Sequence, residues 1–196
     1  MQAFRKNGSL KLATGWSSKK TSKVDCLLRG ETSERLIYRE LEPSDFHDWL
    51  PFFSDPTSSE YWSEEILRPE KACQKWFDKA FFRYQNNLGG MNALIHKETG
   101  IFIGQCGLLK QTVDGIDELE IGYSLLPEHR KKGYATEAAK KCKSFAFEHK
   151  LSNSLISIIH VDNKPSQRVA LNNGMLWDKT TTYKNNPVHI YRVINK

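Results

Sequence analysis

The segment 127–138 constrains the fold most, because it joins a strand to a helix through a basic turn that contains a glycine. A strand-like run at 119–126 leads into this turn, and a helix-like run at 135–147 leads out of it. The N–H groups in the first turn of a helix have no intrahelical acceptor, and the helix dipole adds partial positive charge beside them. Gly133 has no side chain to hold a ligand off the backbone, and Ala135 has only a methyl group. This order of strand, turn and helix predicts a pocket for a diphosphate.

Two common phosphate motifs are absent from the sequence of this turn. It has neither the Gly-Lys-Ser/Thr of a P-loop nor the Gly-x-Gly-x-x-Gly spacing of a dinucleotide site. Its pattern is Arg-x-x-Gly-x-Ala, formed by Arg130, Gly133 and Ala135. A basic turn before a helix also occurs as an ordinary solvated cap. The order of the surrounding segments has to decide between the two interpretations.

The excess positive charge of the chain lies at its N-terminal end. The 196 residues have a net charge of +6, and residues 1–30 hold seven basic residues against Asp25 alone. Residues 31–196 hold 22 basic and 22 acidic residues, so we expect one folded domain there that does not bind nucleic acid by its bulk charge. Residues 1–30 are predicted to be a disordered basic extension. A transit-like segment, a translation start placed too far upstream, and an arm that binds nucleic acid are the alternatives.

The remaining composition favours a cytoplasmic protein without a metal site. The sequence contains no apolar run of membrane-spanning length and no N-terminal apolar region, so we expect neither a membrane span nor a secretory signal. The cysteines, at 26, 73, 106 and 142, form no Cys-x-x-Cys pair and are expected to be reduced and buried. The six histidines show no metal-binding spacing.

Hydrophobic periodicity predicts one domain in which helices and strands are mixed. Strands are expected at 35–41, 91–95, 101–109, 118–126, 154–161, 175–183 and 188–194. Helices are expected at 45–53, from about 69 to 85, at 135–147 and at 164–172. The last two strands are expected to form a hairpin around 184–187. This order predicts the α+β class, built around one sheet.

The ordered blocks resemble the GNAT family of N-acetyltransferases, and within it the RimJ and RimL branch that acetylates the N-termini of ribosomal proteins. The matching blocks are 34–41 with Asp45, 120–125, 133–138, and Asn163-x-x-Ser166 followed by 173–175. The pattern over 130–135 is similar to the pyrophosphate loop of that family. The resemblance covers residues 33–196. It implies the acyl-CoA N-acyltransferase fold, with a mixed central sheet flanked by helices, and an enzyme that uses acetyl-CoA without a metal.

The resemblance also implies how the cosubstrate is held. Backbone amides over 130–135 would bind the diphosphate, and a bulge near 123–125 would free backbone that pairs with the pantetheine arm. The amide of Leu125 is the expected oxyanion donor. Lys131 and Lys132 are equally explained as exposed lysines, and Asn163 as a helix N-cap. The expected cofactor residues are Tyr123, Ser124, Leu125, Arg130, Lys131, Lys132, Gly133, Tyr134, Ala135, Asn163 and Ser166.

Two residues are expected to carry the chemistry. Glu120, on the central strand, is the expected base, because an amine is largely protonated at neutral pH and has to lose a proton. An exposed or ion-paired carboxylate is the alternative for Glu120. The resemblance implies that Ser166 protonates the leaving thiolate or holds the cofactor, since Ala170 occupies the position where many family members have a tyrosine. Thr182 stands before Tyr183 where the ribosomal enzymes have an acidic residue, which weakens the transfer of their mechanism.

The acceptor is expected between the early helices and the closing hairpin. Tyr61 and Trp62 are the predicted wall of its pocket, with simple packing over the core as the alternative. His189 and Tyr191 of the closing hairpin are also candidates to reach the site. The acceptor would be a protein N-terminus or another primary amine, and a small molecule such as an aminoglycoside, polyamine or amino acid is the second possibility. A catalytically silent acyl-CoA-binding module is a third, and the protein is expected to be a monomer or a homodimer.

Overall fold

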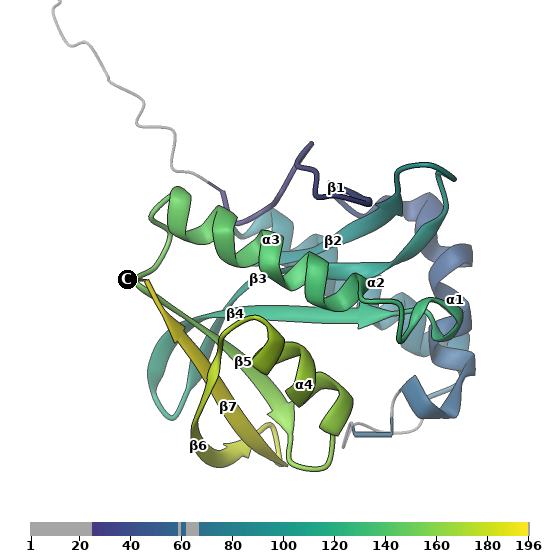
Figure 1. The fold of residues 1–196 in the computed structure, drawn as a ribbon. Coiled ribbons are helices and arrows are strands. Elements are labelled where there is room, and N and C mark those ends of the chain that lie inside the picture. Colours follow the sequence, from purple (N-terminus) through teal and green to yellow (C-terminus); the bar gives the residue numbers. More distant parts are fainter. Residues whose placement is uncertain (1–24, 59, 62–66, 196) are drawn as a thin grey trace, which may run out of the picture.

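Seven strands form one sheet in the computed structural model, which describes residues 25–58, 60–61 and 67–195 (Figure 1). The strands lie in the order β1-β2-β3-β4-β5-β7-β6. Every neighbouring pair is antiparallel except β4 and β5, which run parallel. The predicted mixed sheet and α+β class are confirmed. The strands are β1 (Leu36–Arg39), β2 (Gly89–His96), β3 (Phe102–Val113), β4 (Ile116–Leu125), β5 (Ser154–His160), β6 (Leu176–Tyr183) and β7 (Asn186–Ile194).

Helices cover both faces of this sheet. They are α1 (Phe46–Ser54), α2 (Pro69–Gln85), α3 (Tyr134–Glu148) and α4 (Lys164–Asn172). α3 lies across one face, where Ala138, Cys142 and Ala146 join a core with side chains of β1 to β4 (Figure 1). α1 and α2 pack on the opposite face around the buried Trp49 and Phe77. α4 lies beside α3 on the first face (Figure 1).

The bounds of α2 follow directly from its sequence. The helix begins at Pro69, whose ring fixes a helical φ and whose missing N–H is not needed at the first helical position. Its buried residues are Cys73, Phe77 and Ala80, which recur at the helical spacing of four and three. The predicted helix from about 69 to 85 is therefore confirmed at both ends.

The closing hairpin is tighter than predicted. β6 ends at Tyr183 and β7 begins at Asn186, so Lys184 and Asn185 alone form the turn. Their φ values are +49° and +63°. Positive φ at both central residues is typical of a type I′ turn, whose twist suits two antiparallel strands. The last strand therefore begins two residues earlier than the predicted 188–194.

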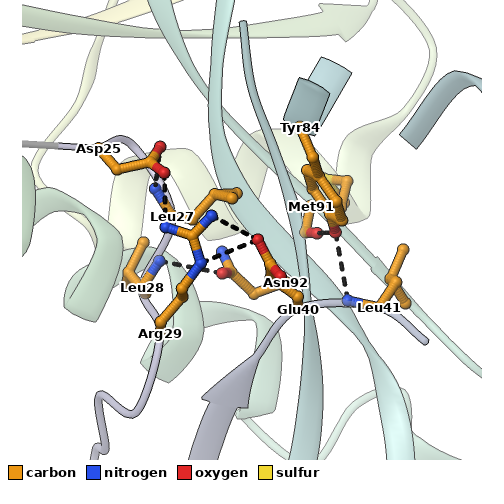
Figure 2. Close-up of polar contacts among 9 residues, drawn as sticks. All are labelled: Asp25, Leu27, Leu28, Arg29, Glu40, Leu41, Tyr84, Met91 and Asn92. Atoms are coloured by element: carbon orange, nitrogen blue, oxygen red, sulfur yellow. Dashed lines mark hydrogen bonds and ion pairs between the residues drawn. The ribbon is translucent and has the colours of Figure 1, made fainter. Parts of the chain in front are cut away.

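Residues 25–30, assigned by sequence to the N-terminal extension, pack against the domain. Cys26, Leu27 and Leu28 are buried, and Leu28 N–H donates to the buried Asn92 Oδ1 (3.0 Å; Figure 2). Asn92 Nδ2 in turn donates to the carbonyl of Cys106 on β3 (3.0 Å). The sequence boundary at residue 30 is therefore too far along the chain. Residues 1–24 of the predicted extension lie outside the described residues.

The four cysteines are free thiols with buried side chains, as predicted. The Sγ atoms of Cys106 and Cys142 lie 3.5 Å apart, where β3 meets α3. Burial raises the pKa of Cys73 to about 12, which keeps that thiol protonated and unreactive at neutral pH. Among the described helices, none has the length and apolar character needed to cross a bilayer.

Candidate functional site

The candidate site is built where the parallel strands β4 and β5 separate. β4 pairs with β3 along its whole length, but its pairing with β5 consists of one registered pair, Glu120 opposite Ile156. Beyond Glu120 the two strands diverge, so the end of β4 has a ladder partner on one side only. The predicted cofactor residues Tyr123, Ser124 and Leu125 lie along this separated stretch.

This separation arises without a bulge in β4. The predicted bulge near 123–125 is absent from the described strands, because the register between β3 and β4 is constant along the pair. Leu126 N–H donates to the carbonyl of Ile103, at the start of β3 (3.1 Å). Backbone groups of antiparallel strands alternate in direction, so the N–H groups of Tyr123 and Leu125 point to the opposite side, into the gap towards β5.

Side chains already occupy two carbonyl groups on this edge of β4. Ser157 Oγ donates to Ile121 O (2.9 Å), and Arg130 Nε donates to Leu125 O (3.1 Å). What the edge still presents to a ligand is the N–H groups of Tyr123 and Leu125 and the carbonyl of Tyr123. An extended ligand with amide groups can pair with such an edge as an added strand does.

The turn between β4 and α3 presents a row of backbone amides. Arg130 N–H donates to Pro127 O (3.2 Å), which removes it from the predicted set of phosphate donors. The first bond of α3 runs from Glu137 N–H to Gly133 O (3.0 Å), so the amides of the first helical turn have no intrahelical acceptor. In the part of the chain that the structure describes, no protein acceptor is bonded to the amides of 131–135.

Two left-handed residues shape this turn. Gly133 is the N-cap of α3 with φ of +84°, and Lys131 has φ of +61° although it carries a side chain. A non-glycine residue held in this region costs about 1 kcal/mol or more. A Cβ at Gly133 would also lie 3.3 Å from Arg35 Nη2. The backbone at position 133 therefore favours glycine, and the alternating sign of φ over 131–133 favours a concave row of N–H groups that suits an anion.

The side chain of Arg130 clamps the turn to the segment that follows α1. Its Nη1 donates to Asp55 Oδ2 (3.0 Å) and to Thr57 Oγ1 (2.9 Å), and its Nη2 donates to Ser58. The hydrogen bond from Thr57, above all, and the charge of Arg130 hold the pKa of Asp55 below its usual range. With four of its five N–H donors engaged in this way, the Arg130 guanidinium positions the turn.

A second set of contacts joins Arg35, the residue before β1, to α3. Arg35 is not among the predicted site residues. Arg35 Nε donates to Glu137 Oε2 (2.7 Å), Arg35 Nη1 donates to the carbonyl of Lys132 (3.0 Å), and the guanidinium lies 4.3 Å from the ring centre of Tyr134. Burial opposes ionisation of Glu137, but hydrogen bonds from the backbone of Arg35 and from Ser33 lower its pKa. Arg35 therefore contacts two of the predicted cofactor residues, through the carbonyl of Lys132 and the ring of Tyr134.

The start of α4 closes the other side of the gap. Asn163 Oδ1 accepts from Ser166 N–H (3.1 Å), so Asn163 is an N-cap, the alternative that the sequence left open. Tyr123 Oη donates to the carbonyl of Ser166 (2.8 Å) and thereby links β4 to α4. Burial raises the pKa of Tyr123, which keeps its hydroxyl protonated. Ala170 is buried in α4.

Glu120 is half-buried on the sheet face opposite α3. Its Oε2 accepts from Gln111 Nε2 of β3 (2.7 Å). Burial is the main influence on its carboxyl and raises the pKa, whereas Gln111, Arg83, Lys184 and the backbone of Ile158 act in the opposite direction. Glu120 is therefore neither an exposed carboxylate nor a partner in a close ion pair, and its raised pKa suits a proton acceptor.

Gln111 is not among the predicted site residues, although the sequence holds a signal for it. It lies between Leu109 and Val113 at the alternating spacing of β3, and Val113 is buried on the same face. A polar residue at an inward position of a strand needs a hydrogen-bond partner. Here the partners are Glu120 and Tyr183, whose Oη donates to Gln111 Oε1 (3.0 Å).

The acceptor residues are placed only in part. The ring of Tyr61 lies 5.4 Å from that of His160, at the end of β5. His160 alternates with Ile156 and Ile158 on the face that carries Glu120, so Tyr61 lies on the same side of the sheet as Glu120. Trp62 lies outside the described residues.

The two other hairpin candidates are engaged away from Glu120. His189 Nδ1 pairs with the hydroxyl of Thr180 on the neighbouring strand (2.8 Å). Tyr191 is buried and its Oη donates to Gln167 Oε1 of α4 (3.4 Å). Among the described residues, neither His189 nor Tyr191 makes a contact with the Glu120 carboxylate. We therefore leave both out of the candidate site.

Comparison with protein families places most of the chain in a known domain family. The family model described as an acetyltransferase (GNAT) domain matches residues 35–176. The Bacillus subtilis protein YkkB is 33% identical over 142 residues, which is 71% of this chain and 80% of YkkB. The matched region contains β1 to β5, α1 to α4, the turn at 127–133 and Glu120.

Solved structures share the fold at lower identity. An acetyltransferase from Agrobacterium tumefaciens superposes with a TM-score of 0.73 at 24% identity, covering 98% of this chain and all of that one. RimL, a ribosomal L7/L12 α-N-protein acetyltransferase solved with coenzyme A, gives 0.67 at 14% over 86% of this chain and 97% of its own. A Vibrio cholerae spermidine N-acetyltransferase, solved with CoA and spermine, gives 0.65 at 16% over 82% and 95%. At these identities the likeness concerns the fold.

Proposed function

The chain belongs to the GNAT family of acetyltransferases, and on that premise we propose that it moves an acetyl group from acetyl-CoA to the α-amine of a protein N-terminus. The thioester supplies an activated acetyl group, so the amine can attack it directly in a ternary complex. The protein has to hold both reactants, accept one proton and stabilise negative charge on the carbonyl oxygen.

The observation that carries this proposal is the continuity of two donor surfaces. The open edge of β4 ends at Leu125, and the row of amides at 131–135 follows one short turn later. CoA has the matching order of groups, with amides along its pantetheine arm and a diphosphate beyond them. The residues present therefore fit the cosubstrate. The exposed side chains of Lys131 and Lys132 add long-range attraction for its negative charge.

Two groups near the end of β4 are assigned to the developing charges. The N–H of Leu125 points into the gap and serves as the oxyanion donor. Ser166 lies across the gap, where the contact between its carbonyl and Tyr123 holds the start of α4 close to β4. Its hydroxyl is the candidate donor to the leaving thiolate. Asn163 contributes by capping α4 and so by fixing where Ser166 lies.

Glu120 is assigned as the base. A buried carboxyl with a raised pKa is a stronger proton acceptor than an exposed one, and remains ionised once the pH exceeds that raised value. Activity is therefore expected to fall as the pH decreases through the pKa of Glu120. An incoming amine would approach from the sheet face that carries Glu120 and the Tyr61–His160 ring pair.

The charges around Glu120 favour a peptide terminus over a polyamine as acceptor. Arg83 and Lys184 both lie near enough to Glu120 to lower its pKa by their charge. Glu118, on the same face of β4, is paired with Arg192 (2.6 Å). A substrate with several positive charges would meet these cations, whereas a peptide terminus brings one amine. A polyamine or another small amine remains the runner-up, as in the spermidine enzyme with the same fold.

A matched pair of glycine variants tests the cosubstrate site. We expect acetyl-CoA to raise the Tm of the parent protein, and Gly133→Glu to abolish that rise, because the new side chain places bulk and negative charge at the row of amides. Gly115→Glu is the control: Gly115 also has positive φ (+78°), has open space around its Cβ position, and lies in the turn at the far end of β4. Equal shifts in all three proteins would reject the cosubstrate site.

Release of free CoA, followed with peptides and with spermidine, then separates the functional alternatives. Turnover with peptides bearing a free N-terminus, and none with spermidine, supports the proposal. The reverse preference would replace it with the small-molecule enzyme. A rise in Tm with acetyl-CoA but no turnover on any amine would identify a silent binding module.

A further inference from the structure

A chain of hydrogen bonds leads from the closing hairpin to Glu120. Tyr183 Oη of β6 donates to Gln111 Oε1 (3.0 Å), and Gln111 Nε2 of β3 donates to Glu120 Oε2 (2.7 Å). The three residues come from three strands, and the two bonds span 72 and 9 positions of the sequence. All three side chains are half-buried, so these bonds are shielded from water more than surface contacts are.

The direction of this chain follows from the chemistry of its groups. A tyrosine hydroxyl that donates to an amide must meet the amide oxygen, which turns the amide nitrogen of Gln111 towards Glu120. The nitrogen can only donate, and an ionised carboxylate can only accept. The arrangement is therefore complementary to Glu120 as a carboxylate. A rotated amide would instead place its oxygen against the carboxylate.

The strand β6 reaches Gln111 because it curls over the β3–β4 hairpin. Lys179, Thr181 and Tyr183 alternate along β6 and so share one face. Lys179 Nζ pairs with Asp114 Oδ2 (2.7 Å), Thr181 Oγ1 donates to Asp114 Oδ1 (2.8 Å), and Tyr183 makes the third contact, to Gln111. The register between β6 and β7 shifts between Trp177 and Lys179, and a shift of this kind locally bends and twists a strand.

From this geometry we propose that Gln111, oriented by Tyr183, is a positioning residue for Glu120. Gln111 holds the Glu120 carboxylate in one orientation and favours its ionised form. Because Tyr183 orients Gln111, the pKa of Glu120 depends on the position of the closing hairpin. The functional value of this arrangement rests on the proposed role of Glu120 as the base. The hairpin forms one side of the expected acceptor region, so a displacement of β6 would weaken the bond that favours the carboxylate.

Other charged groups also act on Glu120 and have to be kept constant in a test. Arg83 of α2 and Lys184 of the β6–β7 turn favour its ionised form by their charge. Tyr123, three residues along β4, is held protonated by burial, and Glu118 is paired with Arg192 of β7. The backbone of Ile158 on β5 also stabilises the charged form. None of these groups bonds to the Gln111 amide among the described contacts, so variants at Gln111 leave them in place.

The test is a direct titration of the Glu120 carboxyl by NMR in protein labelled with ¹³C-glutamate, with Glu120→Gln used to assign the signal. Gln111→Leu removes the donor and is expected to raise the pKa of Glu120 by about one unit. Gln111→Glu places a second carboxylate there and is expected to raise it further, since two like charges disfavour joint ionisation. Tyr183→Phe frees the amide to rotate and is expected to give a smaller rise.

Thr181→Val is the matched control, because it removes a hydrogen bond between β6 and the same hairpin without touching Gln111. It should leave the Glu120 titration unchanged. An unchanged titration in Gln111→Leu, or an equal rise in Thr181→Val, would overturn the proposal.

The acidic limb of the kcat profile for a free-N-terminus peptide separates this proposal from the proposed function. If the acidic limb in the Gln111 variants moves together with the Glu120 pKa measured by NMR, the result supports both the positioning role of Gln111 and the role of Glu120 as the base. A moved titration with an unmoved limb supports the positioning role and removes Glu120 as the base.

Discussion

Glu120 shows how a single residue can serve function at a cost to stability. Its half-buried carboxyl has a raised pKa, chiefly because burial disfavours the charge. The folded protein therefore binds a proton at Glu120 more tightly than the unfolded chain does. The contribution of Glu120 to the free energy of unfolding is therefore most favourable below the unfolded pKa of about 4.3. This contribution is lost as the pH rises through the folded pKa.

Glu120→Gln should separate these two effects. We expect turnover to fall by 10²-fold or more, in the usual range for loss of a positioned base (about 10²–10⁴), with little change in the KM for acetyl-CoA. The Tm at neutral pH should be equal to or above that of the parent, and the difference should shrink as the pH falls through the folded pKa and disappear below the unfolded pKa of about 4.3. Steady-state kinetics and melting across pH measure both. Undiminished turnover would exclude Glu120 from the reaction.

Arg130 shows what a sequence pattern cannot reveal about a residue. Its position in Arg-x-x-Gly-x-Ala predicted that its backbone amide binds the diphosphate, but that N–H donates to Pro127 O, and its guanidinium binds Asp55, Thr57 and Ser58. These partners lie more than 70 positions earlier in the chain, and no local pattern connects them to the turn. Gly133, in contrast, was recognisable because its role depends on its own backbone and on the helix that follows.

At the scale of elements, the segment 25–30 acts as part of the core. Leu28 is fully buried and its N–H is bonded to Asn92, whereas Arg29 makes ion pairs with Asp25 and Glu40 at the surface (Figure 2). Sequence analysis missed this segment because three apolar residues in a basic stretch show no period. Their burial depends on β2 and β3, which are more than 60 positions away.

Two substitutions in this segment should differ sharply. Leu28→Ala is expected to lower the free energy of unfolding by about 2–5 kcal/mol, because it opens a cavity in a packed core. Arg29→Ala removes exposed ion pairs and should cost less than about 1 kcal/mol. Chemical denaturation measures both. Similar small losses would show that the segment does not belong to the folded core.

The separation of β4 from β5 is an element-scale feature that was predicted with the wrong cause. The family resemblance pointed to the right residues, 123–125, but attributed the gap to a bulge. The register with β3 is unbroken, and the gap follows from the divergence of two strands that share one registered pair. The paired residues Glu120 and Ile156 lie 36 positions apart, and local periodicity does not describe how two such distant strands are oriented.

For the whole molecule, the elements and the family could be read from the sequence, and the contacts between distant elements could not. The helical period of α2 and the strand–turn–helix order around Gly133 are local, so both were predictable. The Arg35–Glu137 clamp and the Tyr183–Gln111–Glu120 chain join elements that meet only in the folded sheet. The candidate site is thus a local loop of predictable type, supported by long-range contacts that required the structure.

The central claim is that the backbone amides of 131–135 hold the diphosphate of CoA, and amide hydrogen exchange measured residue by residue tests it directly. CoA should slow exchange at 131–135 and at Tyr123 and Leu125, whereas pantetheine, which lacks the diphosphate, should affect only the latter two. Arg130, whose N–H already donates to Pro127, is an internal reference and should change least. Saturating CoA that slows exchange elsewhere and leaves 131–135 unprotected would contradict the account.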